Sequence, residues 1–308
     1  MKLYFIATRL WRYLNIYFLK PFDAVNDTLT SYLIFEKIKI KNNFLEIGSG
    51  DGMFSFIMCG GKFSIKFDRY LDIDLKKDDI FDTHKKLIKF NYNFKKMIRP
   101  SISVDAKINH IKKIRQIGFS KKIYHTSYEK LPFKNNSINY IFFYTAHGMK
   151  SLDKSVSSAY KVLMKKGKLV ILVFDNYVKK HFICHNLKKK GIFPKVFQKF
   201  DNGRFKEISK YSKSIIDWEN FFKKKGFSIV KRTEGLSGIA WKFYDVQTRP
   251  ILKYLIIFFN FLPDNLRVLF KFIWMISIYP FLFLFFILFS NIFFNSNRNC
   301  YHVFELKK

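Results

Sequence analysis

The sequence predicts an α/β fold with a mostly parallel sheet. A short apolar run at 44–47 leads into a glycine cluster at 48–52 and then a helix expected over 53–59. A second strand is expected at 69–74, so that strand, glycine turn, helix and strand form a unit with parallel strands. Residues 169–174 (LVILVF) are continuously apolar, as in a strand buried on both faces.

The remaining elements are expected in an order that extends this sheet. Helices are expected over 30–40, 105–117, 152–164 and 212–225, and strands over 122–126, 138–144, 228–231 and 300–306. The connection over 75–118 is longer than most, which is typical of a lid or a substrate-facing insertion. Cys59, Cys184 and Cys300 are far apart, which argues against a disulfide framework or a structural zinc site, and no metal is expected.

The charge of the chain is strongly positive. Its 308 residues carry 56 Lys and Arg against 23 Asp and Glu, a formal net charge of +33. Such a surface attracts polyanions, either nucleic acid or anionic lipid headgroups. A compositional bias toward Lys, Asn, Ile and Phe, as an A+T-rich genome would give, explains the same excess. The lysines are scattered along the chain, so nucleic acid is not the expected partner.

The glycine cluster is the predicted ligand site. Gly48, Gly50 and Gly52 come directly after a strand and before a helix, where the backbone can pass close to a ligand. Their spacing is GxGxG, which suits a cofactor with an amino-acid moiety and no pyrophosphate. Asp74 is placed by this interpretation at the end of the second strand, where a carboxylate can accept hydrogen bonds from ribose hydroxyls.

Four motifs together resemble the class I S-adenosylmethionine-dependent methyltransferases. LEIGSGDG at 45–52 is similar to their glycine motif and LDIDL at 71–75 to their acidic loop. YEKLPFKNNSINY at 128–140 and YKVLMKKGKLV at 160–170 resemble their "LPF" and "RVLKPGG" segments. The resemblance implies a Rossmann-like seven-stranded fold, here with an apolar helical insertion before the last strand, and S-adenosylmethionine as cofactor.

The resemblance also implies roles for particular residues. The cofactor-binding set expected from it is Glu46, Gly48, Ser49, Gly50, Gly52, Asp74, Tyr128, Glu129 and Tyr144. Glu46 would lie near the cofactor ammonium, Asp74 at the ribose and Tyr128 with Glu129 along the adenine. Methyl transfer needs an aligned acceptor and, for a hydroxyl, a base. His147 is the candidate base, with His125 and Asp175 as weaker ones.

Two apolar segments indicate membrane contact. Residues 251–262 are too short to span a bilayer, whereas 268–294 are long enough. If 300–306 is a strand of the same sheet, both ends of the apolar region lie on one side, which favours a monotopic or re-entrant arrangement; otherwise a single span remains open. Headgroup contacts are expected from Lys253, Arg267 and Lys271, with Trp241 and Trp274 near the interface.

The expected organisation has four parts. Residues 1–29 form an amphipathic helical segment, lying either at the membrane interface or against the catalytic domain. Residues 30–235 form the cofactor-binding domain, 236–299 the membrane-associated helices and 300–308 the final strand. The expected function is methyl transfer to an oxygen or carbon of a lipid-linked, glycolipid or isoprenoid acceptor at the cytoplasmic side of a membrane. Alternatives are a soluble nucleotide-sugar or polysaccharide acceptor, and a non-catalytic or RNA-binding protein.

Overall fold

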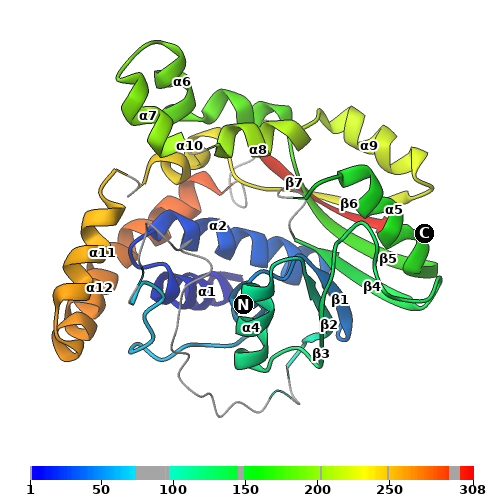
Figure 1. Ribbon diagram of the computed structural model, residues 1–308, viewed down its shortest axis with the longest axis horizontal. Helices are drawn as coiled ribbons and strands as arrows, with labels where there is room; N and C mark the ends of the chain where they lie inside the picture. Colours follow the sequence, from blue (N-terminus) through cyan, green and yellow to red (C-terminus); the bar gives the residue numbers. More distant parts are fainter. Residues whose placement is uncertain are drawn as a thin grey trace.

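The computed structural model describes residues 2–71, 73, 94, 97–144, 149–201, 203–247, 250–290 and 299–308. Its centre is a seven-stranded sheet in the order β3-β2-β1-β4-β5-β7-β6 (Figure 1). The strands are β1 (Phe44–Ile47), β2 (Pro100–Asp105), β3 (Lys122–His125), β4 (Ile138–Phe143), β5 (Leu163–Phe174), β6 (Ser228–Glu234) and β7 (Tyr301–Lys307). This is the Rossmann-like seven-stranded fold that was expected.

Strand direction divides the sheet into two parts. β1 pairs in parallel with β2 and β4, and β2–β3 and β4–β5 are parallel as well. β7 lies antiparallel between β5 and β6. The carboxyl ends of β1 to β5 therefore meet at one edge, where open α/β sheets bind ligands.

Neighbouring residues of the central strands face two different hydrophobic cores. Phe142 packs in one core while Ile141 and Phe143 pack in the other, because successive side chains of a strand alternate between faces. β7 repeats the pattern with Val303 and Phe304. Burial on both faces is the reason that these strands read as continuous apolar runs.

Helices cover both faces of the sheet. The helical segments are α1 (Lys2–Ile16), α2 (Pro21–Tyr32), a π-helical turn (Leu33–Ile38), α3 (Met53–Met58), α4 (Ile108–Ile117), α5 (Leu152–Val162), a 3-10 segment (Asn176–His181), α6 (Ile183–Lys189), α7 (Pro194–Asp201), α8 (Arg204–Tyr211), α9 (Ile215–Lys224), α10 (Gly238–Val246), α11 (Leu252–Phe261) and α12 (Asp264–Phe289). Helices α1, α2, α3 and α10 to α12 contribute to the core that contains Phe142, and α5 with α9 to the core that contains Ile141.

The predicted second strand is wrong. Arg69, Tyr70 and Leu71 form a turn, and the strand beside β1 is β2 instead. In β2, the residues Ile102, Ser103 and Val104 pair with consecutive residues of β1. The helix expected from Asp105 begins only at Ile108, because Asp105 is the last residue of β2. The other expected strands are confirmed, with β5 beginning earlier, at Leu163.

Helix α1 packs on the domain, the second of its two expected positions. Phe5, Ile6, Leu10 and Leu14 are buried. The basic side chains on the same helix bind carbonyl groups at the end of α3: Arg9 Nε donates to Met58 O at 3.1 Å, and Arg12 Nη1 to Gly60 O at 2.6 Å. These arginines therefore hold α1 against the end of α3.

Helices α11 and α12 form an apolar hairpin at one end of the molecule, next to α1 and α2 (Figure 1). One face of α12 is packed along its length. Lys271 Nζ donates to Phe67 O at 2.5 Å, Trp274 Nε1 to Phe18 O at 2.7 Å and Tyr279 Oη to Ala7 O at 3.1 Å. Within the described residues, α12 is the one helix with the length and composition to cross a membrane.

Two expectations about this hairpin are wrong. Arg267 and Lys271 do not face outward: both are buried, and Arg267 Nε donates to Phe259 O at 3.0 Å. Trp241 is also in the core, between Phe174 and Phe182. An isolated charge on an apolar helix is as readily satisfied by buried carbonyl groups as by a headgroup, and the sequence does not distinguish the two.

Candidate functional site at the carboxyl edge of the parallel strands

The glycine loop has a backbone that other residues rarely adopt. Gly48, Gly50 and Gly52 have φ values of 72°, 57° and 81°, all in the left-handed region. The loop is fixed to β2, because the amides of Gly48 and Ser49 donate to Val104 O at 2.9 and 3.2 Å. A Cβ on Gly50 would meet no atom within 4 Å, so the loop faces open space at that point. A ligand can therefore approach the backbone closely at Gly50.

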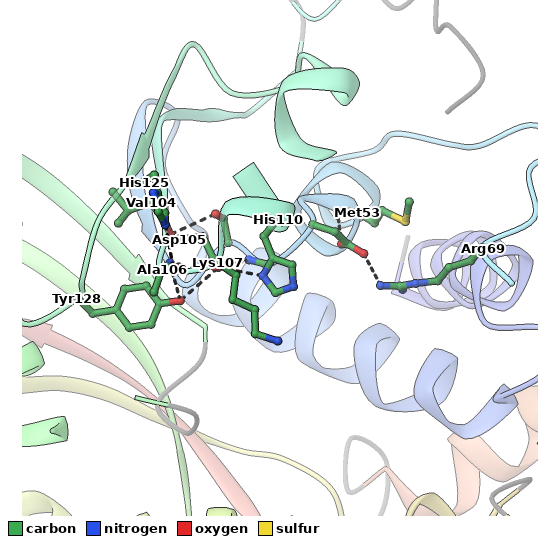
Figure 2. A network of polar contacts seen from close by, with 12 residues as sticks. Met53, Arg69, Val104, Asp105, Ala106, Lys107, His110, His125 and Tyr128 are labelled. Atoms are coloured by element: carbon green, nitrogen blue, oxygen red, sulfur yellow. Dashed lines mark hydrogen bonds and ion pairs between the residues drawn. The ribbon is translucent and has the colours of Figure 1, made fainter. Parts of the chain in front are cut away.

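Asp105 is the acidic residue beside the glycine loop (Figure 2). Its Oδ2 accepts from the Gly50 amide at 2.9 Å and from Tyr128 Oη at 3.2 Å. Its Oδ1 accepts from the Lys107 amide at 2.8 Å and lies 3.1 Å from His110 Nδ1. The position is the carboxyl end of the strand next to β1, where the sequence interpretation had placed Asp74.

Two side chains orient this carboxylate from opposite sides (Figure 2). Burial lowers the pKa of His110, but the hydrogen bond and charge of Asp105, together with the charge of Asp51, outweigh burial, and the pKa is raised. Tyr128 lies against Phe143 at the end of β4, and burial raises the pKa of its phenol, so that it remains a neutral donor to Asp105. Asp105 is thus held in a fixed direction at the strand ends.

Glu46 is turned into the protein rather than toward the loop. Ser55 Oγ donates to its Oε1, and Ser103 Oγ donates to its Oε2 at 3.2 Å. Burial raises the pKa of Glu46 to about 7 despite these hydrogen bonds. Both carboxylate oxygens are engaged by neighbours in α3 and β2, so the predicted contact with a cofactor ammonium stays a prediction.

Glu129 and Tyr144 reach different parts of the site. Glu129 Oε1 accepts from the Ser151 amide at 2.8 Å, which points it toward the start of α5. Tyr144, the residue after β4, stacks on Phe54 with ring centroids 4.2 Å apart. Its hydroxyl donates to Asp27 Oδ1 of α2 at 3.0 Å. The structure therefore brings Tyr144 to the glycine-loop side of the edge, together with a carboxylate that the sequence did not indicate.

Several predicted residues are placed elsewhere or not at all. Asp74 and the candidate base His147 lie outside the described residues. His125 Nε2 is 3.0 Å from Ala106 O, and Asp175 Oδ2 is 3.5 Å from His302 Nε2. No group of three or more potential metal ligands occurs within the part of the chain that the structure describes.

The residues present fit an adenosine-bearing cofactor. The backbone at Gly50 borders open space, and beside it lies the Asp105 carboxylate, a group that can accept hydrogen bonds from ribose hydroxyls. The signal for Asp105 was available in the sequence: ISVD combines β-branched residues with a terminal carboxylate, and it precedes a helix. LDIDL matched the same pattern and came earlier in the chain.

Comparisons with known proteins relate the chain to others by structure. No family model matches it, and no curated protein sequence resembles it at a significant level. Similar structures include a S-adenosylmethionine-dependent methyltransferase from Thermotoga maritima, described as a possible histamine N-methyltransferase, with a TM-score of 0.47 and 14% identity over 91% of this chain and 89% of that one.

Two further structures are similar to the same extent. A putative sarcosine dimethylglycine methyltransferase from Galdieria sulphuraria has a TM-score of 0.46 and 11% identity, covering 92% of this chain and 84% of that one. The [4+2]-cyclase SpnF has a TM-score of 0.45 and 10% identity, covering 91% and 79%. One fold can host different reactions, so these identities carry no activity over to this chain. By its strand order and glycine loop, the chain has the seven-stranded fold of the class I S-adenosylmethionine-dependent methyltransferases.

Proposed function

We propose that the chain is a S-adenosylmethionine-dependent methyltransferase. The observation that carries this proposal is the pairing of the glycine loop with Asp105 at the carboxyl edge of the parallel strands, where Gly50 N and Asp105 Oδ2 are 2.9 Å apart. A backbone loop and a carboxylate in this relation can bind adjoining parts of an adenosine-bearing ligand. The LEIGSGDG segment, which resembles the glycine motif of the family, forms β1 and this loop.

The bound cofactor supplies an already activated methyl group. Its transfer is an in-line displacement, so the protein contributes mainly alignment of the acceptor with that group. The glycine loop and Asp105 fix one side of the site, while Tyr144 and Phe54 form an aromatic wall between the ends of β4 and β1. Removal of an acceptor proton, where one is needed, falls to a residue at this edge.

The acceptor is proposed to be presented at a membrane surface. The α11–α12 hairpin exposes large apolar side chains on the face that is not packed: Tyr254, Ile257, Phe258, Phe261, Leu266, Leu269, Phe270, Phe272, Ile273, Ile276, Phe281, Leu284 and Leu288. Phe261 is 88% exposed. Contiguous apolar surface of this kind is typical of a protein or membrane contact. Lys253, exposed at the start of α11, adds a charge that suits anionic headgroups.

A monotopic position is favoured over a span. α12 is anchored to α1 by Tyr279, to the connection before α2 by Trp274 and to the segment after α3 by Lys271, so it lies along the domain. β7 then returns the chain to the sheet. We therefore propose that the hairpin lies in one leaflet on the cytoplasmic side. A lipid-linked sugar, a glycolipid or an isoprenoid quinone precursor fits such a position as acceptor.

Calorimetric titration of the detergent-solubilised chain with S-adenosylmethionine tests the cofactor. The wild-type chain should bind, and Asp105→Asn should weaken binding by roughly 10- to 100-fold, because a hydrogen bond to a charged group contributes about 1.5–3 kcal/mol. Asp153→Asn is the control, since its exposed side chain lies at the start of α5. Absence of binding by folded wild-type protein would contradict the proposal. Methylation of lipid extracts by the binding-competent chain would then identify the acceptor.

A further inference from the structure

A second polar network lies at the point where the sheet reverses its order. From β1 the chain proceeds outward to β2 and β3, and it returns to the other side of β1 as β4. Ligands of open α/β sheets bind outside the strand ends at such a switch point. At this point the glycine loop follows β1 and Tyr144 follows β4, and the Tyr144 hydroxyl donates to Asp27 Oδ1 of α2 at 3.0 Å.

Asp27 is connected to both central strands. On the β4 side it accepts from Tyr144, whose ring stacks on Phe54 in the first turn of α3. On the β1 side it is hydrogen-bonded by Tyr17. The Tyr17 ring lies under Arg69, 5.0 Å from the guanidinium carbon. Arg69 in turn forms an ion pair with Asp51 of the glycine loop.

Asp27 differs from the nearby carboxylates of Asp23 and Asp51 in the charge of its partners. Asp23, one turn earlier on α2, has Lys20 Nζ at 2.8 Å, and Asp51 has Arg69. Among the described residues, Asp27 has neutral hydrogen-bond donors: two tyrosine hydroxyls and the Asn26 amide at 3.3 Å. It is 5% exposed. Burial, and then the neighbouring Asp23, raise its pKa to about 7.

A buried carboxylate without a paired cation is costly, and it is retained where a ligand supplies the charge. We infer that Asp27, framed by Tyr144 and Phe54, is the counter-charge for a positive group of the bound S-adenosylmethionine. This inference rests on the proposed function. The ligand carries two such groups, the ammonium of its methionine part and the sulfonium.

Binding is then linked to ionisation of Asp27. A cation stabilises the charged carboxylate, so the ligand lowers the pKa of Asp27 and releases a proton when binding occurs near or below pH 7. Affinity should rise with pH up to about 7 and become constant above it. The titratable or charged groups that act on Asp27 or respond to it are Tyr13, Tyr17, Asp23, Arg69, Tyr144, Tyr244 and Tyr301. The five tyrosines have raised pKa values and stay neutral over this range.

The test is calorimetry of the full chain between pH 6 and 8 with three probes. S-adenosylmethionine has both cations, S-adenosylhomocysteine lacks the sulfonium, and 5′-methylthioadenosine lacks both. For the wild type we expect S-adenosylmethionine affinity to rise up to tenfold per pH unit below 7, with proton release, and 5′-methylthioadenosine affinity to be flat. Persistence of the pH dependence with S-adenosylhomocysteine identifies the ammonium as the paired group, and its loss identifies the sulfonium.

Two isosteric variants test which carboxyl causes the pH dependence of binding. Asp27→Asn should remove the pH dependence and reduce S-adenosylmethionine affinity more than tenfold, with circular dichroism confirming the fold. Glu46→Gln removes the other buried carboxyl with a pKa of about 7. If Glu46→Gln rather than Asp27→Asn removes the pH dependence, the inference is wrong. A flat wild-type profile for S-adenosylmethionine also overturns it, while failure of the folded wild type to bind at all overturns the proposed function with it.

Discussion

At the scale of single residues, Gly50 and Gly118 have nearly the same backbone but different surroundings. Their φ values are 57° and 68°, and a Cβ on either would meet no atom within 4 Å. Gly50 opens onto the proposed cofactor site, whereas Gly118 follows the end of α4. The pair therefore separates the cost of backbone strain from the cost of blocking a ligand.

Substitution by alanine should make this separation measurable. Gly50→Ala and Gly118→Ala should each lower the free energy of unfolding by about 1–2 kcal/mol, the cost of a left-handed alanine. Gly50→Ala alone should weaken S-adenosylmethionine binding by roughly tenfold or more, or at least about 1.4 kcal/mol. Denaturant unfolding and calorimetry measure the two effects. Equal affinities in the two variants would place the ligand away from Gly50.

The residue scale is also where sequence-based prediction fails. The glycines and Tyr144 could be placed at the edge because each follows a strand with a clear apolar pattern, whereas Tyr128 was placed there by the resemblance of its segment to a family motif. Asp105 was assigned to a helix, since LDIDL offered an earlier acidic match and one sequence shows no pairing partner for a strand. Asp27 could not be found from the pattern, because its role depends on α2 folding back over the end of β4.

At the scale of elements, α12 has one face that packs against the domain and another that is exposed. Its buried residues, Arg267, Lys271, Met275, Leu282, Phe285 and Phe286, recur at intervals of mostly three or four positions, which is one face of a helix. The other face is almost as apolar, so its amphipathic character is weak and the sequence does not reveal which side is packed. Composition predicted membrane contact and the expected final strand favoured a monotopic or re-entrant arrangement, but which face of α12 packs on the domain is seen only in the structure.

The exposed face should determine vesicle binding. The wild-type chain should cosediment with vesicles of phosphatidylcholine and phosphatidylglycerol. The triple substitution Phe261→Ser, Ile273→Ser and Leu284→Ser should reduce partitioning by about a hundredfold or more, since burial of each large apolar side chain contributes on the order of 1.5–3 kcal/mol.

A matched control lies outside the hairpin. Ile192, Phe193 and Val196, at α7, are exposed apolar residues outside the hairpin, and Phe193 is 73% exposed. Serine at these three positions should leave vesicle binding unchanged. If both triple variants retain binding, the chain adsorbs through its general basic charge instead, because serine substitutions leave that charge unchanged. High salt would then abolish binding of the wild type.

At the scale of the whole molecule, Glu46 couples stability to pH. Its pKa is about 7 in the folded chain, against 4.5 for a glutamate side chain that is not buried. The folded state thus holds a proton that the unfolded state loses between these values, so this carboxyl reduces stability progressively as pH rises from about 4.5 to 7. The full effect is about 3 kcal/mol by the conversion of 1.36 kcal/mol for each pKa unit.

Glu46→Gln should remove that dependence. The variant and the wild type should have similar stability near pH 4.5, and the variant should be more stable by on the order of 3 kcal/mol at pH 8. Urea unfolding at several pH values measures the difference. A variant that is less stable than the wild type at pH 8 would show that Ser55 and Ser103 require the charged form.

The architecture as a whole could be predicted better than its details. β1, β3, β4, β5, β6 and β7 were expected at or near their observed positions, because alternation and apolar runs are local signals. The strand beside β1 was assigned to the wrong segment, since strand pairing is a long-range property. The positions of α1 and α12 on the domain depend likewise on contacts between distant parts of the chain.

The place of β7 between β5 and β6 has a consequence for the order of assembly. β1 to β5 are contiguous in the sheet, so they can pair as soon as they are synthesised. β6 has only β7 as a neighbour, and β7 is made after α11 and α12. The apolar hairpin therefore leaves the ribosome while the sheet is still open and β6 is unpaired. If the proposed contact of the hairpin with a bilayer forms at that stage, it precedes closure of the sheet, and the chain meets the bilayer before it finishes folding.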